Sequence, residues 1–207
     1  MSSGDERRVG RPVDPAKREA IIAAAVASFF ELGYAGSTIE GIAARAGVSK
    51  VTIYNHFGDK RALLAAAVTR EAERMRAHFE IDAGSTASLP ERLRAIGTAM
   101  VAFLSRPEMV QFERRIAAET EQDPAIGMAF LEHGPRRMKA AFAQLLARAN
   151  DAGELAIPDA DLAAEQFASL CKGMGDLERR FGAPPDPARD ARRIDSAVEV
   201  FLRAYRR

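Results

Sequence analysis

The sequence predicts an all-α protein, and three observations support that fold class. Apolar residues recur every three or four positions along most of the chain, which is the period of an amphipathic helix. Aspartate-proline pairs, which cap and open helices, begin at Asp14, Asp123 and Asp186. No Asn-Gly or Asp-Gly hairpin signal lies between apolar runs.

Composition narrows the possible classes of protein. The chain has 207 residues, 47% of them apolar, and a net charge of +1. It can therefore bury a substantial core, and its charge excludes a polyelectrolyte that binds nucleic acid in bulk. The single cysteine, Cys171, excludes an intrachain disulfide and a thiolate metal cage. No apolar run approaches about 18 residues, and Met1–Arg11 lacks a signal-peptide pattern, so we expect a cytoplasmic protein with no membrane partner.

Three helices are predicted to follow a flexible basic arm at 1–13. Asp14 caps the first helix and Gly33 ends it. Ser37 and Glu40 form a capping box, S-x-x-E, which predicts the start of the second helix.

A third short helix is capped by Ser49 and extends to about His56, after Gly47 has ended the second. We expect these three helices to form a first domain at 14–60. A linking helix at 60–80 then leads into a second domain.

The second domain, 61–207, is predicted to be helical throughout. Gly134-Pro135 either kinks or splits one of its helices. Loops are expected at 82–88 and 150–158. Predicted helix starts are at Leu89, Pro107, Pro124, Asp159 or Asp161, and Pro187.

The stretch Ser37–Lys60 has the spacing of a helix-turn-helix, because two short helices flank Ala46-Gly47-Val48. In such a motif the second helix enters the major groove of DNA. Its inward side here would be Ile53 and Phe57. Its exposed side would carry hydrogen-bonding groups suited to reading base edges, namely Lys50, Thr52, Tyr54, Asn55 and His56. The alternative is a purely structural helix pair.

The amino-acid string is more specific than the helix pattern. Gly33-Tyr34, Ser37–Ala43, Ala46–Lys50, Ile53–Phe57 and Lys60–Leu64 together resemble the DNA-binding domain of the TetR/AcrR family over residues 14–65. The resemblance implies three DNA-binding helices, a fourth linking helix, and a variable helical domain for ligand binding and dimerisation.

The resemblance also implies roles for individual residues. Thr38 corresponds to a phosphate-binding hydroxyl, and Lys60 to a further phosphate contact. Val51 could meet a thymine methyl group, and Asn55 could pair with adenine. With the arm residue discussed next, the candidate DNA-binding residues are Arg11, Thr38, Ser49, Lys50, Val51, Thr52, Tyr54, Asn55, His56 and Lys60.

The arm contains Gly10-Arg11-Pro12, a sequence typical of segments that insert arginine into a narrow A·T minor groove. The alternative is a solvated tail. Residues 1–61 carry a net charge of +2 and the remainder −1, an asymmetry of the right sign for DNA binding.

Heptad spacing in the last two predicted helices, at Ala163–Phe181 and Ala191–Tyr205, fits either a core or a two-fold four-helix interface. The resemblance implies the interface, and a dimer could read a palindrome. The candidate interface residues are Phe167, Met174, Leu177, Phe181, Ile194, Val198, Phe201 and Tyr205.

Methionine and phenylalanine in the middle helices could be core, or could line a cavity for an apolar small molecule as the resemblance implies. The candidate pocket residues are Met75, Phe79, Met100, Phe103, Phe112, Met138, Phe142 and Phe167. A polar anchor for the ligand could be Glu113, Glu119, Gln122 or Gln166.

No enzyme motif, cofactor or metal site is expected, since no histidine has a second ligand at metal-binding spacing. A redox role for Cys171 would need an exposed, acidic thiol. The sequence predicts a DNA-binding regulator, a repressor released by an apolar ligand. Two alternatives are a regulator without a ligand, controlled by a protein partner or acting as an activator, and a helical enzyme or scaffold.

Overall fold

The computed structural model describes residues 14–83 and 87–206, but not the side chains of 78–83. These residues form helices and no named strand, which confirms the predicted fold class. The helices are α1 (Pro15–Gly36), α2 (Ile39–Ala46), α3 (Lys50–Phe57), α4 (Lys60–Ala83), α5 (Leu89–Leu104), α6 (Pro107–Thr120), α7 (Pro124–His133), α8 (Pro135–Asp151), α9 (Ala160–Arg180) and α10 (Pro187–Tyr205).

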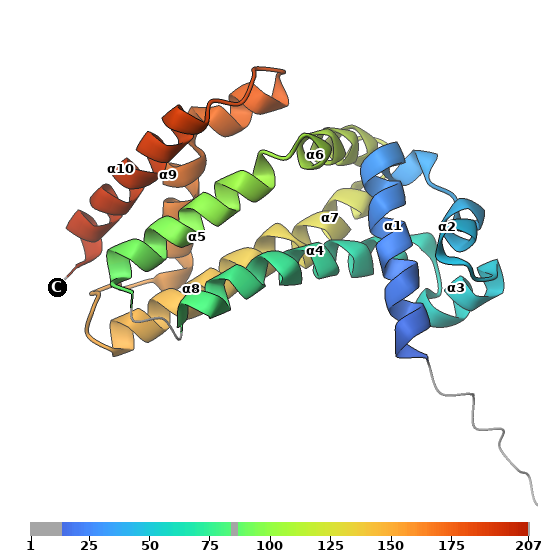
Figure 1. Ribbon diagram of the computed structural model, residues 1–207, viewed down its shortest axis with the longest axis horizontal. Helices are drawn as coiled ribbons and strands as arrows, with labels where there is room; N and C mark the ends of the chain where they lie inside the picture. Colours follow the sequence, from blue (N-terminus) through green and yellow to red (C-terminus); the bar gives the residue numbers. More distant parts are fainter. Residues whose placement is uncertain (1–13, 84–86, 207) are drawn as a thin grey trace, which may run out of the picture.

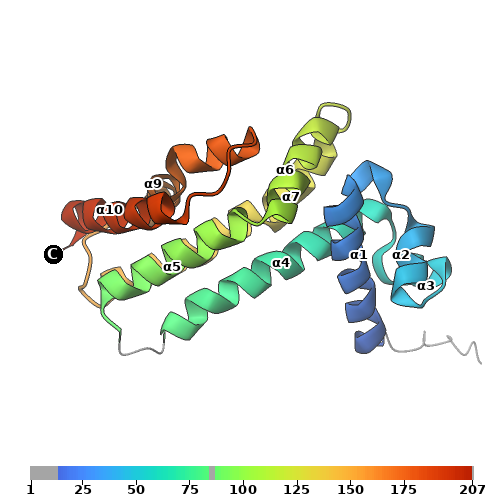
Figure 2. The same ribbon diagram turned by 45° about the horizontal axis from the view of Figure 1, so that its top comes forward.

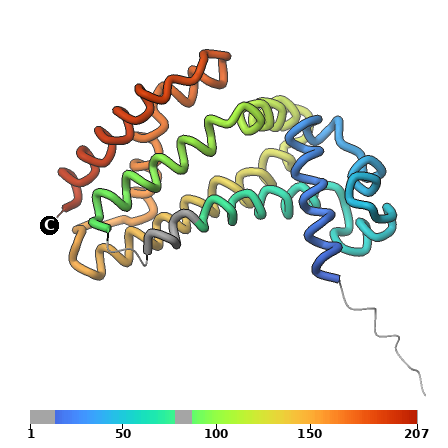
Figure 3. Tube along the Cα trace, viewed as in Figure 1, coloured from blue at the N-terminus to red at the C-terminus, as the bar shows by residue number. Residues whose placement is uncertain are grey.

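The short helices and the last two helices occupy opposite ends of an elongated molecule. In Figure 1, α1–α3 stand at one end and α9 and α10 at the other. The turned view in Figure 2 keeps this separation. The tube in Figure 3 shows α4 leading from the α1–α3 end toward the C-terminal end, where the chain finishes. The surface that α2 and α3 present is therefore remote from the one that α9 and α10 present.

Two apolar clusters hold the molecule together. One joins α5, α8, α9 and α10 around residues such as Leu93 and Phe167. The other joins α1–α3 and the start of α4 around Phe29, Ile42 and Ile53, and it includes Phe112 of α6. This second cluster crosses the expected domain boundary at residue 60, so the first three helices share their core with α6 and α7.

Most helix caps lie where the sequence predicts them. The carboxylate of Asp14 accepts from the N–H groups of Ala16 and Lys17, and Gly47 ends α2 with a left-handed φ of 66°. The predicted capping box is wrong by one residue. Thr38, not Ser37, caps α2, because its hydroxyl oxygen accepts from the N–H of Gly41. Ser37 instead donates its hydroxyl to the carbonyl of Gly33.

Two breaks shape the second half of the chain. Gly134-Pro135 splits the predicted helix into α7 and α8, which settles the open alternative. The heptad spacing predicts no interruption in α9, yet Gly173 breaks it with φ 45° and ψ −152°. The positive φ favours glycine, and a Cβ on Gly173 would lie 2.8 Å from Cδ of Arg193, so a larger residue would also displace that side chain.

Gly33 breaks α1 with φ 78° and ψ 178°, a conformation open almost only to glycine. Two side chains of α6 satisfy the interrupted backbone. Glu119 accepts from the N–H groups of Tyr34 and Ala35, at 3.2 and 3.0 Å. Arg115 donates to the carbonyls of Phe30 and Glu31, at 2.8 and 2.6 Å. We call Arg115, Glu119 and the backbone of 30–35 the α1–α6 clamp.

Among the described helices, α1 is long and apolar enough to cross a membrane by length and composition, contrary to the expectation from the sequence. The same test is passed by core helices. In this structure Ile21, Ala25 and Phe29 of α1 are buried, and the helix packs on α2, α4 and α6. Those contacts account for its apolar character.

We predict that Gly33→Ala lowers the free energy of unfolding by about 2 to 4 kcal/mol. A Cβ there would lie 2.9 Å from Oε1 of Glu119 and would also face a disfavoured φ. Gly153→Ala is the matched control, because Gly153 has the same φ of 78° but nothing within 4 Å of an added Cβ. Chemical denaturation measures both. Equal losses in the two variants would mean that the close approach to the α1–α6 clamp costs nothing.

Candidate DNA-binding interface

Helix α3 separates an inner face from an outer one. Ser49 caps it, accepting from the N–H of Thr52 at 3.2 Å. Ile53 is 1% exposed and fixes the helix on the core, whereas Val51 and Tyr54 are 59% and 47% exposed. An aliphatic and an aromatic side chain held this far out of the core bury only part of their surface within the chain. Their exposure leaves them available to a partner surface.

The polar candidate residues of α3 differ in how far they are exposed beside Val51 and Tyr54. Lys50 and Asn55 are exposed, and Thr52 is half-buried with its hydroxyl 2.9 Å from that of Ser49. His56 is half-buried, and its Nδ1 has no hydrogen-bond partner among the described residues. The structure therefore leaves Lys50, Val51, Tyr54 and Asn55 exposed on α3, with Thr52 and His56 half-buried beside them.

Two predicted phosphate contacts flank α3. The hydroxyl oxygen of Thr38 accepts from the helix backbone, so its hydrogen remains free to be donated. Lys60 lies at the start of α4, as expected. Its Nζ lies 4.4 Å from the centre of the Tyr34 ring, and partial burial lowers its pKa, opposed by nearby Glu119. Arg11 lies outside the described residues.

Exposed ion pairs cover the basic groups of this unit. Nζ of Lys50 is 3.5 Å from Oε1 of Glu40, and Nη2 of Arg45 is 2.7 Å from Oε2 of Glu31. Such pairs contribute only about 0 to 1 kcal/mol. A DNA phosphate can therefore displace the carboxylate at little cost, which makes these lysine and arginine groups available to a nucleic acid.

The candidate interface on α9 and α10 divides into two groups. Met174, Leu177 and Phe181 are exposed, with Phe181 85% exposed. Tyr205 is half-buried and donates its hydroxyl to Gln166 at 2.6 Å. The prediction that the other four candidates face a partner is wrong, because their side chains are buried within the chain. These residues are Phe167, Ile194, Val198 and Phe201.

A groove of about 1130 Å³ lies between α9 and α10 on this same face. Leu170, Met174 and Val200 supply apolar walls, and Arg192 and Arg193 supply charge. The groove is continuous with the exposed side chains of α9, so this end of the molecule presents an uncovered apolar surface.

The candidate pocket residues of the middle helices lie in the two clusters instead. None of them lines the groove. Met75, Phe112, Phe142 and Phe167 are buried. Met100, Phe103 and Met138 are partly buried against the α5–α8–α9–α10 cluster. The side chain of Phe79 lies outside the described residues.

The four candidate polar anchors have separate positions. Glu119 is used in the α1–α6 clamp, so both its oxygens are already engaged. Glu113 pairs with Arg180 at 3.2 Å, and burial raises its pKa. Gln122 is exposed, and Gln166 accepts from Tyr205. Among the described residues, no group of three metal-binding side chains gathers.

The sequence alone does not predict the clamp. Arg115 and Glu119 lie about 85 residues from their partners, and no local motif marks them. The one available signal was Gly33, whose need for an unusual backbone angle predicts a break but not what stabilises it.

Comparison with known proteins agrees with this geometry. Residues 21–67 match the model "Bacterial regulatory proteins, tetR family", and residues 91–207 match "AefR-like transcriptional repressor, C-terminal domain". The chain is 33% identical over 123 residues to the HTH-type transcriptional regulator BetI of Stenotrophomonas maltophilia, covering 49% of this chain and 62% of BetI.

Solved structures extend the likeness over nearly the whole chain. A TetR-family regulator of Mesorhizobium loti is 28% identical with a TM-score of 0.79, covering 95% of this chain and all of the other. The flavonoid-responsive regulator FrrA is 30% identical with a TM-score of 0.72, covering 93% and 98%. These relatives are named as transcriptional regulators.

Cys171 yields a prediction about redox chemistry. The residue is buried, and burial raises the pKa of its thiol to about 12. The thiol is therefore neutral at pH 8, and a neutral thiol is a poor nucleophile. We predict that dithionitrobenzoate reacts with Cys171 only after unfolding, which absorbance in native and denaturing buffer measures. Rapid stoichiometric reaction of the native protein would contradict this and favour a redox role.

Proposed function

Because the chain belongs to the TetR family of bacterial transcriptional regulators, we propose that it is a repressor acting in the cytoplasm as a homodimer. Each subunit places α3 in one half-site of a palindromic operator. An apolar small molecule bound in the second domain releases the dimer from DNA. The observation that carries the proposal is the outer face of α3, where Val51 and Tyr54 are held away from the core.

Within the proposed interface, the residues divide by role. Lys50, Tyr54 and His56 contact the backbone and groove edge, while Thr38 donates to a phosphate at the start of α2. Val51, Thr52 and Asn55 set the sequence preference through base edges. Ser49 caps α3 next to the phosphates. Lys60 reaches a phosphate by leaving the face of Tyr34, and Arg11 enters the adjacent minor groove.

We propose 14–60 as the DNA-reading domain and 61–207 as the regulatory domain, linked by α4. Dimer formation uses the exposed face of α9 and α10, with Met174, Leu177, Phe181 and Tyr205 across the two-fold axis. The large apolar side chains of this face are exposed in the single subunit and would be buried by a partner. An exposed apolar patch of this kind is typical of an interface. Pairing two subunits places two recognition helices about 34 Å apart, one turn of DNA.

The effector site is proposed among the partly buried residues of the middle helices, including Met100, Phe103 and Met138. Their flexible or aromatic side chains suit an apolar ligand. The ligand weakens DNA binding only to the extent that it prefers the conformation that does not fit the operator. The flavonoid response of FrrA, a relative of the same architecture, favours a small-molecule effector.

A second candidate keeps DNA binding but replaces the small molecule with a protein partner or with activation. The tight packing of Phe112, Phe142 and Phe167 favours it, because those side chains fill the space that a ligand would need. Ligand-dependent loss of operator affinity decides between the two.

Selection of duplexes from a random pool tests the proposed DNA reading. We predict a palindromic consensus. Lys50→Ala and Tyr54→Ala should each weaken binding to it by on the order of tenfold to a hundredfold, and Lys50→Ala should also reduce the salt dependence. Lys139→Ala on α8, remote from α3, is the control. A salt-steep affinity without a consensus would contradict sequence-specific repression.

A charge on the exposed α9 face tests the proposed dimer. We predict that Leu177→Glu converts the dimer to a monomer in sedimentation velocity, because it buries a carboxylate against its symmetry mate. Met128→Glu, at a comparably exposed apolar residue of α7, should leave the dimer intact. An unchanged dimer with Leu177→Glu would place the interface elsewhere.

A further inference from the structure

The C-terminal half of α9 differs from the rest of the helix in what holds it. Beyond Gly173, the residues of α9 that are buried are Gly175 and Arg179. The apolar side chains there, such as Met174 and Leu177, face outward. This half-helix therefore buries almost no apolar side chain within its own subunit.

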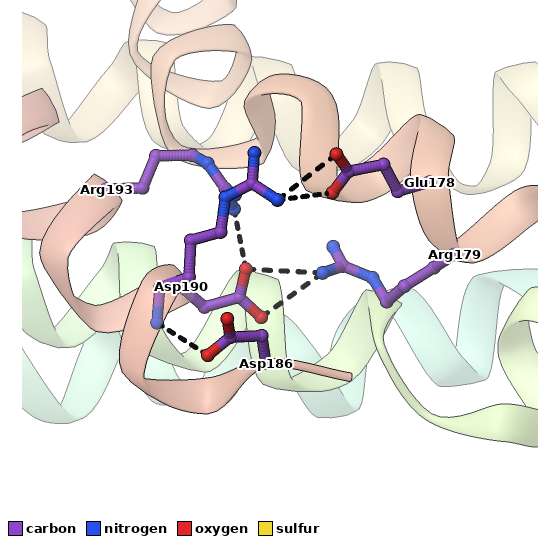
Figure 4. Close-up of polar contacts among 6 residues, drawn as sticks. Glu178, Arg179, Asp186, Asp190 and Arg193 are labelled. Atoms are coloured by element: carbon purple, nitrogen blue, oxygen red, sulfur yellow. Dashed lines mark hydrogen bonds and ion pairs between the residues drawn. The ribbon is translucent and has the colours of Figure 1, made fainter. Parts of the chain in front are cut away.

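Charged contacts replace that burial. Nη2 of Arg114 on α6 donates to the carbonyl of Arg179 at 2.6 Å, and Arg180 pairs with Glu113 of α6 at 3.2 Å. Toward α10, Arg189 donates to both carboxylate oxygens of Glu178, at 3.1 and 2.9 Å (Figure 4). Segments held by polar contacts, with little apolar burial, open more readily than the core.

Arg179 is the exception in this exposed segment, since its side chain is only 6% exposed. Nη1 donates to the two oxygens of Asp190, at 3.3 and 3.2 Å (Figure 4). Nε and Nη2 are buried and have no hydrogen-bond partner among the described residues. A buried donor without a partner costs about 1 to 3 kcal/mol, and more when it is charged.

The two unpartnered atoms are not an arbitrary pair. In a planar guanidinium, Nε–H and Nη2–H point the same way and form the edge that binds a carboxylate with two parallel hydrogen bonds. Asp190 contacts the other nitrogen. The edge best suited to an oxyanion is therefore the one left without an acceptor.

The carboxylates around this edge are already committed to other groups. Oδ1 of Asp190 also accepts from Arg193 at 2.6 Å, so one carboxylate serves two guanidinium groups. Glu178 is engaged by Arg189 through both oxygens. Asp186 lies in the same cluster and accepts from the N–H of Arg189 (Figure 4). The three arginines there are therefore matched by three carboxylates, and what the Nε–Nη2 edge lacks is a hydrogen-bond acceptor.

We propose that Arg179 anchors the carboxylate of a small organic acid, bound through the Nε–Nη2 edge when the C-terminal half of α9 shifts relative to α6 and α10. The inference rests on the proposed function in one respect: it names the chemical class of the effector. The contacts of this half-helix with Glu113 and Arg114 would pass its displacement to α6, and α6 holds α1 through the clamp.

The test uses the full-length ¹⁵N-labelled protein with octanoate and 3-phenylpropanoate as probes, each against its primary amide at equal ionic strength. The Nε–Hε resonance of Arg179 is assigned from its loss in Arg179→Lys. We expect both acids, and neither amide, to shift this resonance and to raise Tm. Arg179→Lys keeps the positive charge but lacks the pair of parallel guanidinium donors. It should therefore lose most of the rise in Tm, and Arg179→Gln should lose it as well.

Arg203→Gln is the matched control, because Arg203 is an exposed arginine of α10 paired with Glu199. It should keep the carboxylate-dependent rise in Tm. Asp190 retains Arg193 in the Arg179 variants, and their circular dichroism should match that of the native protein.

The proposal is overturned if acid and amide act equally, if neither acid shifts the resonance at about 10 mM, well above typical effector affinities, or if Arg179→Gln keeps the full response. These failures would leave operator binding through Lys50 and Tyr54 unaffected. Loss of a DNA consensus would conversely leave carboxylate binding at Arg179 intact.

Discussion

The break in α1 at Gly33 is the constraint on which the rest of the structure depends. A helix interrupted in its last turns exposes carbonyl and N–H groups that must find partners. Arg115 and Glu119 supply those partners from a helix more than 70 residues further along the chain. Because α1 carries much of the core under α2 and α3, this clamp determines where the DNA-reading surface lies relative to α6.

In the proposed regulator, the clamp would transmit a change in the second domain to the DNA-binding helices. Phe112 and Ile116 of α6 share a core with α1–α3 and the start of α4. A shift of α6 would therefore disturb its packing against α1 and α4. At its outer side α6 is tied to α9 through Glu113 and Arg114. The elements α9, α6 and α1 are thus linked in series by charged contacts, which is the arrangement that a two-state regulator needs between its effector and its operator.

Local signals in the sequence predicted most of the fold. Caps such as Asp14 and Ser49, and the left-handed Gly47, depend on neighbouring residues and were recognisable without tertiary knowledge. The features that the sequence did not predict depend on contacts between residues far apart in the chain. At the break in α9, the side chain of Arg193 passes close to Gly173, a contact that no local pattern indicates. Phe167 and its neighbours on the heptad seam proved to be core, since spacing does not tell which partner an apolar face meets.

In the proposed dimer, we expect the clamp to set the spacing of the two recognition helices. Spin labels at exposed Ala44→Cys, in a Cys171→Ala background, report this spacing by double electron–electron resonance on the dimer. Glu119→Ala should broaden the distance distribution and weaken operator binding, while Glu121→Ala, exposed at the end of the same helix, should change neither. An unchanged distribution and affinity in Glu119→Ala would contradict the account.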